Sequence, residues 1–160
     1  MSIKSDRAVQ KFLGGYSCAQ SVFSSFCDDL HIDENTALKL ACGFGAGMGM
    51  KEEVCGAVTG GILVLGAAYG RGTHDDRKAT ERTYAKTREL MERFSEKHGT
   101  VICRRLLGGC ELMTEAGQRQ FKDKDLRNKV CAPCVQTVVE ILEGFTLINR
   151  AATISSTEQR

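Results

Sequence analysis

Cysteine is the residue type in this sequence whose number and spacing point to chemistry. The 160 residues include eight cysteines, and the last two form the motif C-A-P-C at Cys131 and Cys134. A cysteine thiolate is both the nucleophile of thiol redox reactions and a ligand for soft metal ions. A chain of this length can build a core without a disulfide scaffold, so in a reducing compartment this many cysteines indicate metal binding, redox chemistry or both.

The C-A-P-C motif by itself leaves more than one kind of site open. A CxxC ahead of a helix occurs in thioredoxin-like dithiols and in halves of zinc-binding knuckles. The strand pattern of a thioredoxin fold is missing, and there is no second CxxC to complete an ordinary zinc ribbon. Because Val135 rather than a histidine follows the motif, we expect no haem. Cysteines far apart in the sequence could still form an iron–sulfur or zinc site with four sulfur ligands.

The most apolar stretch, residues 54–70, predicts the helix around which the other elements pack. It reads V-C-G-A-V-T-G-G-I-L-V-L-G-A-A-Y-G and contains no charge, but it is shorter than the ~20 apolar residues of a membrane span. Glycine costs ~1 kcal/mol in a helix, so Gly56, Gly60 and Gly61 need a packing reason, namely close approach of other segments. Cys55 then lies in the first turn, where unpaired N–H groups and the helix dipole lower the pKa of a thiol.

Other cysteines also fall at predicted helix starts. The capping-box spacing in S-C-A-Q makes Cys18 the first residue of a helix that runs to about Leu30. Cys103 lies in the first turn of a short predicted helix, and Pro133 favours a helix start just after Cys131. Each helix N-terminus favours negative charge by ~0.3–1 kcal/mol, so these positions support a cluster of thiolates. Three further cysteines fall at helix ends or in loops and are expected to matter less: Cys27, Cys42 and Cys110.

The remaining segments also favour helices. We expect Asp33 to cap a short helix, a long charged helix from about Asp75 that stops at Gly99, and irregular or weakly helical structure at 111–128. Residues 43–49 carry glycine at alternate positions but lack the flanking signals of a phosphate loop, so we expect them to fold over the helix at 54–70 and offer N–H donors to its cysteine. The histidines lack i, i+4 pairing and are not expected to act as ligands or bases.

Composition sets the class of protein. The net charge is +2 with both signs interspersed, and there is no tryptophan, so neither nucleic-acid binding nor direct membrane insertion is expected. The first ten residues lack the apolar core of a signal peptide, which predicts a cytoplasmic protein. We predict one all-α domain of six or seven helices over residues 1–150, followed by a disordered polar tail at 151–160.

Several of these segments resemble the C_GCAxxG_C_C family of redox-active proteins. C-G-A-V-T-G is similar to its CGAxxG motif, and the likeness continues in G-Y-S-C-A-Q-S-V, H-G-T-V-I-C-R-R-L-L-G and V-C-A-P-C-V, over roughly residues 5–149. The four characteristic cysteines of the family then correspond to Cys18, Cys55, Cys103 and Cys131. The resemblance implies redox or metal-cluster chemistry. Family members are often encoded beside transporter genes, which makes a membrane transporter a candidate partner.

We therefore predict a redox-active protein that works by electron transfer or by thiol/disulfide exchange. Cys18, Cys55, Cys103 and Cys131 would form the site and hold an iron–sulfur cluster or zinc, with Cys55, Cys131 and Cys134 as the reactive thiols. Cys134 would be a fifth member of the site or a resolving thiol. Two alternatives stay open: a non-catalytic metal-binding or sensing module, and a helical adaptor for a transporter. The sequence does not specify the redox partner or the oligomeric state.

Overall fold

The computed structural model describes residues 1–145, and helices make up the fold of this part of the chain. Within it, the only pairing of extended backbone is an isolated antiparallel bridge between Val54 and Ile102. The all-α prediction is therefore confirmed. The elements in chain order are α1 (Ile3–Leu13), α2 (Cys18–Ser24), α3 (Cys27–Leu30), α4 (Glu34–Ala41), η1 (Cys42–Phe44), α5 (Gly45–Met48), α6 (Gly56–Tyr69), α7 (Arg77–His98), α8 (Cys103–Leu106), α9 (Glu115–Asp123), η2 (Arg127–Cys131) and α10 (Ala132–Glu143).

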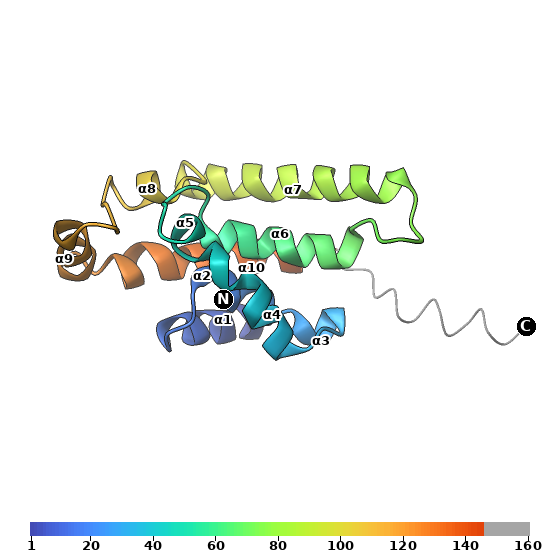
Figure 1. Cartoon of the computed structure of the whole chain (residues 1–160), viewed down its shortest axis with the longest axis horizontal. Coiled ribbons are helices and arrows are strands. Elements are labelled where there is room, and N and C mark those ends of the chain that lie inside the picture. Colours follow the sequence, from blue (N-terminus) through green and yellow to red (C-terminus); the bar gives the residue numbers. More distant parts are fainter. Residues whose placement is uncertain (146–160) are drawn as a thin grey trace, which may run out of the picture.

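The longer helices form the body of the molecule. α6 packs against α2, α7 and α10, and α1 packs against α10 and α2. Figure 1 shows α7 running beside α6 along the long axis, with α1 and α4 on the opposite side of α6. The short elements α5 and α8, together with α9, lie at the end where α6 begins. The predicted tail at 151–160 lies outside the described residues.

In the first half of α6, the glycines have the packing role that their spacing predicts. A Cβ at Gly60 would lie 2.7 Å from the carbonyl oxygen of Ala19, so α2 can approach α6 only because no side chain is there. A Cβ at Gly61 would lie 2.8 Å from side chains of α7 and of α10. Gly66 has no neighbour within 4 Å of its Cβ position, so packing does not explain that glycine. Ten of the fourteen residues of α6 are buried.

Three predicted helix boundaries are confirmed by their hydrogen bonds. Ser17 and Gln20 form a reciprocal capping box at the start of α2. Asp33 accepts a hydrogen bond from the backbone N–H of Thr36 and caps α4. Gly99, with φ of 82°, ends α7 in the left-handed conformation that glycine adopts without steric cost.

One expectation about helix extent is wrong. The helix at Cys18 ends at Ser24 instead of reaching Leu30, because the chain turns more tightly there: the Ser25 N–H and hydroxyl both donate to the Val22 carbonyl. The segment at 111–128, expected to be irregular or weakly helical, contains the helix α9, where Thr114 accepts a hydrogen bond from the Gly117 N–H. Its sequence has few apolar residues, so the helical period gave little signal.

No helix in residues 1–145 combines the length and the apolar character needed to cross a membrane.

Candidate functional site

A cavity of about 430 Å³ opens at the end of the molecule where α6 begins. Apolar side chains such as Leu106, Leu112 and Phe121 form much of its wall. The structure brings all five predicted site cysteines to this cavity, although they come from four separate segments of the chain. They are Cys18, Cys55, Cys103, Cys131 and Cys134.

Cys55 is the cysteine whose surroundings favour the thiolate. It is the N-cap of α6, one position before the first turn in which it was expected. A hydrogen bond from the Cys134 thiol lowers the pKa of Cys55, and the backbone N–H groups of Ala57 and Val58 lower it further. These donors outweigh the effect of burial, which acts in the opposite direction on a side chain only 6% exposed. The expected activation of Cys55 by its helix start therefore has a second source in Cys134.

Cys134 is the protonated partner of Cys55. It lies in the first turn of α10 and is 1% exposed. Its hydrogen bond to Cys55 raises its pKa, and burial raises it further. When the pair loses one proton, these opposite shifts favour the negative charge on Cys55 and leave the remaining proton on Cys134. A thiolate beside a buried thiol is the arrangement of an attacking and a resolving cysteine.

Cys18 packs against the backbone of α6. A Cβ at Gly56 would lie 2.5 Å from the Cys18 sulfur, so the glycine of the C-G-A motif makes room for this thiol. Burial raises the pKa of Cys18 to about 11, and the negative charge of Cys55 contributes in the same direction. A hydrogen bond from the Ala46 backbone N–H opposes them. Cys18 therefore starts a helix, as predicted, yet stays a thiol.

The glycine-rich loop supplies that donor through a left-handed turn. Ala46, Met48 and Met50 have φ of 52°, 66° and 65°, a conformation that costs roughly 1–2 kcal/mol for each residue with a side chain. Gly47 is required in the turn, since a Cβ there would lie 2.6 Å from the Cα of Glu52. The loop was expected to offer donors to Cys55. Its Ala46 N–H instead contacts Cys18, and the donors to Cys55 come from α6 itself.

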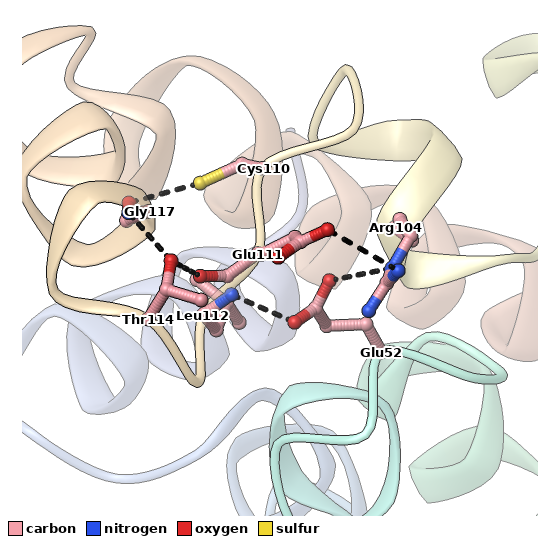
Figure 2. A network of polar contacts seen from close by, with 7 residues as sticks. All are labelled: Glu52, Arg104, Cys110, Glu111, Leu112, Thr114 and Gly117. Carbon is pink, nitrogen blue, oxygen red and sulfur yellow. Dashed lines mark hydrogen bonds and ion pairs between the residues drawn. The ribbon is translucent and has the colours of Figure 1, made fainter.

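Glu52 fixes the wall of the cavity that carries Cys103. Its carboxylate, on a residue 3% exposed, accepts from Arg104 Nε at 3.0 Å and from the Leu112 N–H at 2.7 Å. Figure 2 shows this carboxylate between α8 and the segment that follows it. The Cys103 N–H also donates to the Glu53 carbonyl at 2.6 Å. This bond holds α8 against the segment that precedes α6. A buried carboxylate needs such partners to offset its desolvation.

Cys103 stays protonated in this setting. Burial raises its pKa to about 12, and the negative charges of Cys55 and Glu52 add to the effect, as does Cys18 when it is ionised. α8 has only four residues, so its N-terminus provides little dipole to oppose burial.

Cys131 departs from the sequence prediction. It does not precede a free helix start, because the π-helical turn η2 runs into α10 without a break, and the Cys131 backbone is itself helical. No free helix N-terminus is therefore available to stabilise its thiolate. Burial raises the pKa of Cys131, and Cys18, Cys55 and Cys103 raise it further when they are ionised. The predicted cluster of several thiolates at helix starts is therefore not supported at this position.

The three remaining cysteines have different surroundings. Cys27 is buried at the start of α3, away from the cavity lining. Cys110 is fully buried and donates to the Gly117 carbonyl at 3.0 Å, inside the turn shown in Figure 2. Cys42 is exposed and does line the cavity, which the sequence did not indicate.

Sequence reasoning missed His98 and Glu52. His98 lies at the end of α7, with Nδ1 3.9 Å from the Cys134 sulfur and Nε2 2.9 Å from the Thr137 hydroxyl. Its isolated position in the sequence gave no sign of this contact with α10. Glu52 belongs to none of the motifs that the sequence analysis used. Its burial depends on the left-handed turn before it, which no spacing pattern indicates.

The donor set was also compared with the needs of a metal ion. Six cysteines around one cavity have the chemistry of a soft-metal site. Among residues 1–145, however, no three histidine, cysteine, aspartate or glutamate side chains are placed as a metal-binding group. The eight cysteines all lie in this range, and none forms a disulfide. The residues as placed do not fit a metal centre, and we derive no chemical step through one.

Comparison with known proteins identifies the family of this chain. No curated protein and no solved structure matches the chain. The sequence profile of the family described as "Putative redox-active protein (C_GCAxxG_C_C)" matches residues 16–145. The matched region begins just before Cys18 and ends after α10, so it contains every cysteine that lines the cavity. The chain therefore belongs to the C_GCAxxG_C_C family of redox-active proteins.

Proposed function

We propose that the protein carries out thiol/disulfide exchange, with Cys55 as the attacking thiolate and Cys134 as the resolving thiol. The observation that carries the proposal is that both cysteines line one cavity with pKa values shifted in opposite directions. The contact between the two side chains lowers the pKa of Cys55 and raises that of Cys134. The reaction needs both thiols reduced at the start, so we also propose the reducing cytoplasm as the working compartment.

The exchange would proceed in two steps. The Cys55 thiolate attacks one sulfur of a substrate disulfide, forms a mixed disulfide and releases the other substrate sulfur as a thiolate. Cys134 then loses its proton and attacks the Cys55 sulfur, which forms the Cys55–Cys134 disulfide and releases the second substrate thiolate. The protein gives up two electrons and the substrate disulfide takes them. The cavity beside Cys55 gives a small disulfide room to reach the sulfur.

The other cavity cysteines would have supporting roles. Cys18 and Cys103 are expected to stay protonated at pH 7, since their pKa values are raised to about 11 and about 12. Cys131 stays protonated for the same reason and lies one helical turn before Cys134. It is therefore the thiol we expect to exchange with Cys134 if the first disulfide rearranges.

A trapping experiment tests this proposal. The reduced protein, with exposed Cys42 replaced by Ser, is treated with one equivalent of dithiobis(nitrobenzoate), and the disulfides formed are mapped by mass spectrometry. We expect a Cys55–Cys134 disulfide and release of both aromatic thiolates. In Cys134→Ser the reaction should stop at the mixed disulfide on Cys55, whereas Cys27→Ser should behave as the parent. Modification spread over all cysteines would contradict the proposal.

A second candidate function, binding of a soft metal ion, rests on a different observation. Besides burial, the negative charge of Cys55 raises the pKa of Cys103 and of Cys131, and a bound cation would relieve that repulsion as these thiols ionise. Zinc or an iron–sulfur cluster would require the sulfurs to move closer together than they lie here. Anaerobic purification followed by metal analysis and an absorption spectrum tests this candidate. A stoichiometric metal lost in Cys18→Ser but kept in Cys110→Ser would favour it over exchange.

A further inference from the structure

The Cys134 thiol has two hydrogen-bond acceptors beside it and only one proton. One acceptor is the Cys55 sulfur. The other is the His98 ring, whose Nδ1 lies 3.9 Å from the Cys134 sulfur, within the range of a hydrogen bond to sulfur. His98 comes from the end of α7 and Cys134 from the first turn of α10, so the contact joins segments 36 residues apart.

The ring of His98 is held in one orientation. It stacks on Phe94, with ring centroids 4.5 Å apart, and its Nε2 lies 2.9 Å from the Thr137 hydroxyl. A neutral imidazole carries one N–H donor and one acceptor nitrogen. If Nε2–H donates to Thr137, Nδ1 is left with a lone pair directed at Cys134. The hydrogen bond made by one ring nitrogen thus fixes the role of the other.

We propose that His98 is the catalytic base of the resolving step and takes the proton of Cys134 as Cys134 attacks the mixed disulfide on Cys55. This inference rests on the proposed exchange reaction. While Cys55 is a thiolate, it is the stronger acceptor for the Cys134 proton. Once the Cys55 sulfur is bonded to substrate it carries no charge, and His98 Nδ1 becomes the acceptor in contact with the Cys134 thiol.

The proton and the electrons balance in this step. The Cys134 S–H bond breaks and its proton moves to Nδ1 of His98, while the Cys134 sulfur forms a bond to the Cys55 sulfur. The bond between Cys55 and the substrate sulfur breaks, and the substrate leaves as a thiolate. The imidazolium then gives its proton to that thiolate or to water, which restores the neutral ring.

The surroundings of His98 suit a base that works near neutral pH. Burial lowers its pKa, and the positive charge of Lys97 lowers it further, so the ring is neutral and able to accept a proton at pH 7. Cys134 needs such an acceptor because burial raises its pKa, and burial still acts when the Cys55 sulfur is bonded to substrate. A thiol of this kind attacks slowly unless its proton is removed.

The two steps can be timed separately in one experiment. The reduced protein, with Cys42 replaced by Ser, is mixed rapidly with one equivalent of dithiobis(nitrobenzoate), and the coloured thiolate is followed. The first phase reports attack by Cys55 and the second reports attack by Cys134. His98→Asn keeps a polar group near the position of Nδ1 but cannot take up a proton. We expect it to slow the second phase by about 10²-fold and leave the first unchanged.

Two further variants guard against an effect on folding. His98→Ala should show the same slow second phase, and added imidazole should restore much of the rate by filling the space left by the ring. His74→Asn, at an exposed histidine in the loop before α7, is the matched control and should follow the parent in both phases.

The outcomes separate the inference from the function on which it rests. A second phase in His98→Asn within about twofold of the parent would overturn the inference while leaving the exchange reaction in place. Equal slowing of both phases, without rescue by imidazole, would also overturn it, since that result indicates a structural role. If the parent itself shows no second phase and no Cys55–Cys134 disulfide, the proposed exchange fails instead.

Discussion

Cys55 and Cys131 reach the same cavity from the starts of two neighbouring helices, α6 and α10. The pKa values of their two thiols are nevertheless shifted in opposite directions. Cys55 precedes a helix whose first N–H groups are unpaired, and two of those groups point to its sulfur. Cys131 lies within a continuous helical run, because η2 leads directly into α10. The pKa of Cys55 is lowered, and that of Cys131 is raised.

The contrast shows that a buried thiol near a helix start is activated only where donors reach the sulfur. Cys55 is buried and Cys131 is half-buried, and burial alone would raise the pKa of each. At Cys55 the Cys134 thiol and the backbone N–H groups of α6 reverse that effect. At Cys131 the neighbouring negative charges reinforce it. Position on a helix is therefore a weaker guide to reactivity than the number of donors that contact the sulfur.

The largest expected difference is in reactivity toward an alkylating agent. Near pH 7, iodoacetamide should label Cys55 at least about tenfold faster than Cys131, because each unit of pKa changes the thiolate fraction about tenfold. Cys55→Ser should remove the fast reaction, and Cys131→Ser should leave it in place. Peptide mapping of the labelled protein gives both rates. Equal labelling of the two cysteines would break the comparison.

Packing at the start of α6 gives the next largest effect. Gly60→Leu should lower the free energy of unfolding by ~1–3 kcal/mol or more, because even a Cβ would lie 2.7 Å from the Ala19 carbonyl. Gly66→Ala, in the same helix but with open space around the Cβ position, should stabilise the protein by about 0.5–1 kcal/mol. Urea unfolding of the two variants measures the difference. An unchanged stability for Gly60→Leu would show that α2 does not pack closely here.

Removal of the donor thiol should raise the pKa of Cys55 toward that of Cys131. Cys134→Ala takes away the hydrogen bond that contributes most to the lowered pKa of Cys55, so we expect the labelling of Cys55 near pH 7 to slow about tenfold. Cys134→Ser keeps an O–H donor and should slow it less. The pH dependence of the labelling rate measures the pKa directly. A rate indifferent to both substitutions would mean that the backbone N–H groups of α6 suffice.

A gradual effect is expected on stability at high pH. A thiol whose pKa is raised in the folded state favours the folded protein while it is protonated, and this contribution is lost as the pH rises through the folded-state pKa. For Cys18 that window runs from the ordinary thiol range near 8.5 up to about 11. The melting temperature should fall across it, less steeply in Cys18→Ser than in the parent. Cys42→Ser, at an exposed thiol, is the control.

Local sequence predicted the elements that depend on neighbours along the chain. The capping box at Ser17, the Asp33 cap and the Gly99 stop are all found, because each involves residues within about four positions of one another. The apolar run of α6 predicted a buried helix for the same reason. α9 was predicted only as irregular or weakly helical structure, because the residues that follow its Thr114 cap lack the apolar period that marks a helix.

The sequence by itself also indicated most of the cysteines that lie together, since the spacing of helix starts and the CGAxxG motif singled out five of the six that line the cavity, all except Cys42. Only the tertiary structure decided which of them ionises. The donor from Cys134 to Cys55, the N–H of Ala46 at Cys18 and the His98 ring beside Cys134 all come from segments distant in sequence. A pKa depends on what lies within a few ångströms of the sulfur, and helical periodicity carries no information about contacts between helices far apart in the chain.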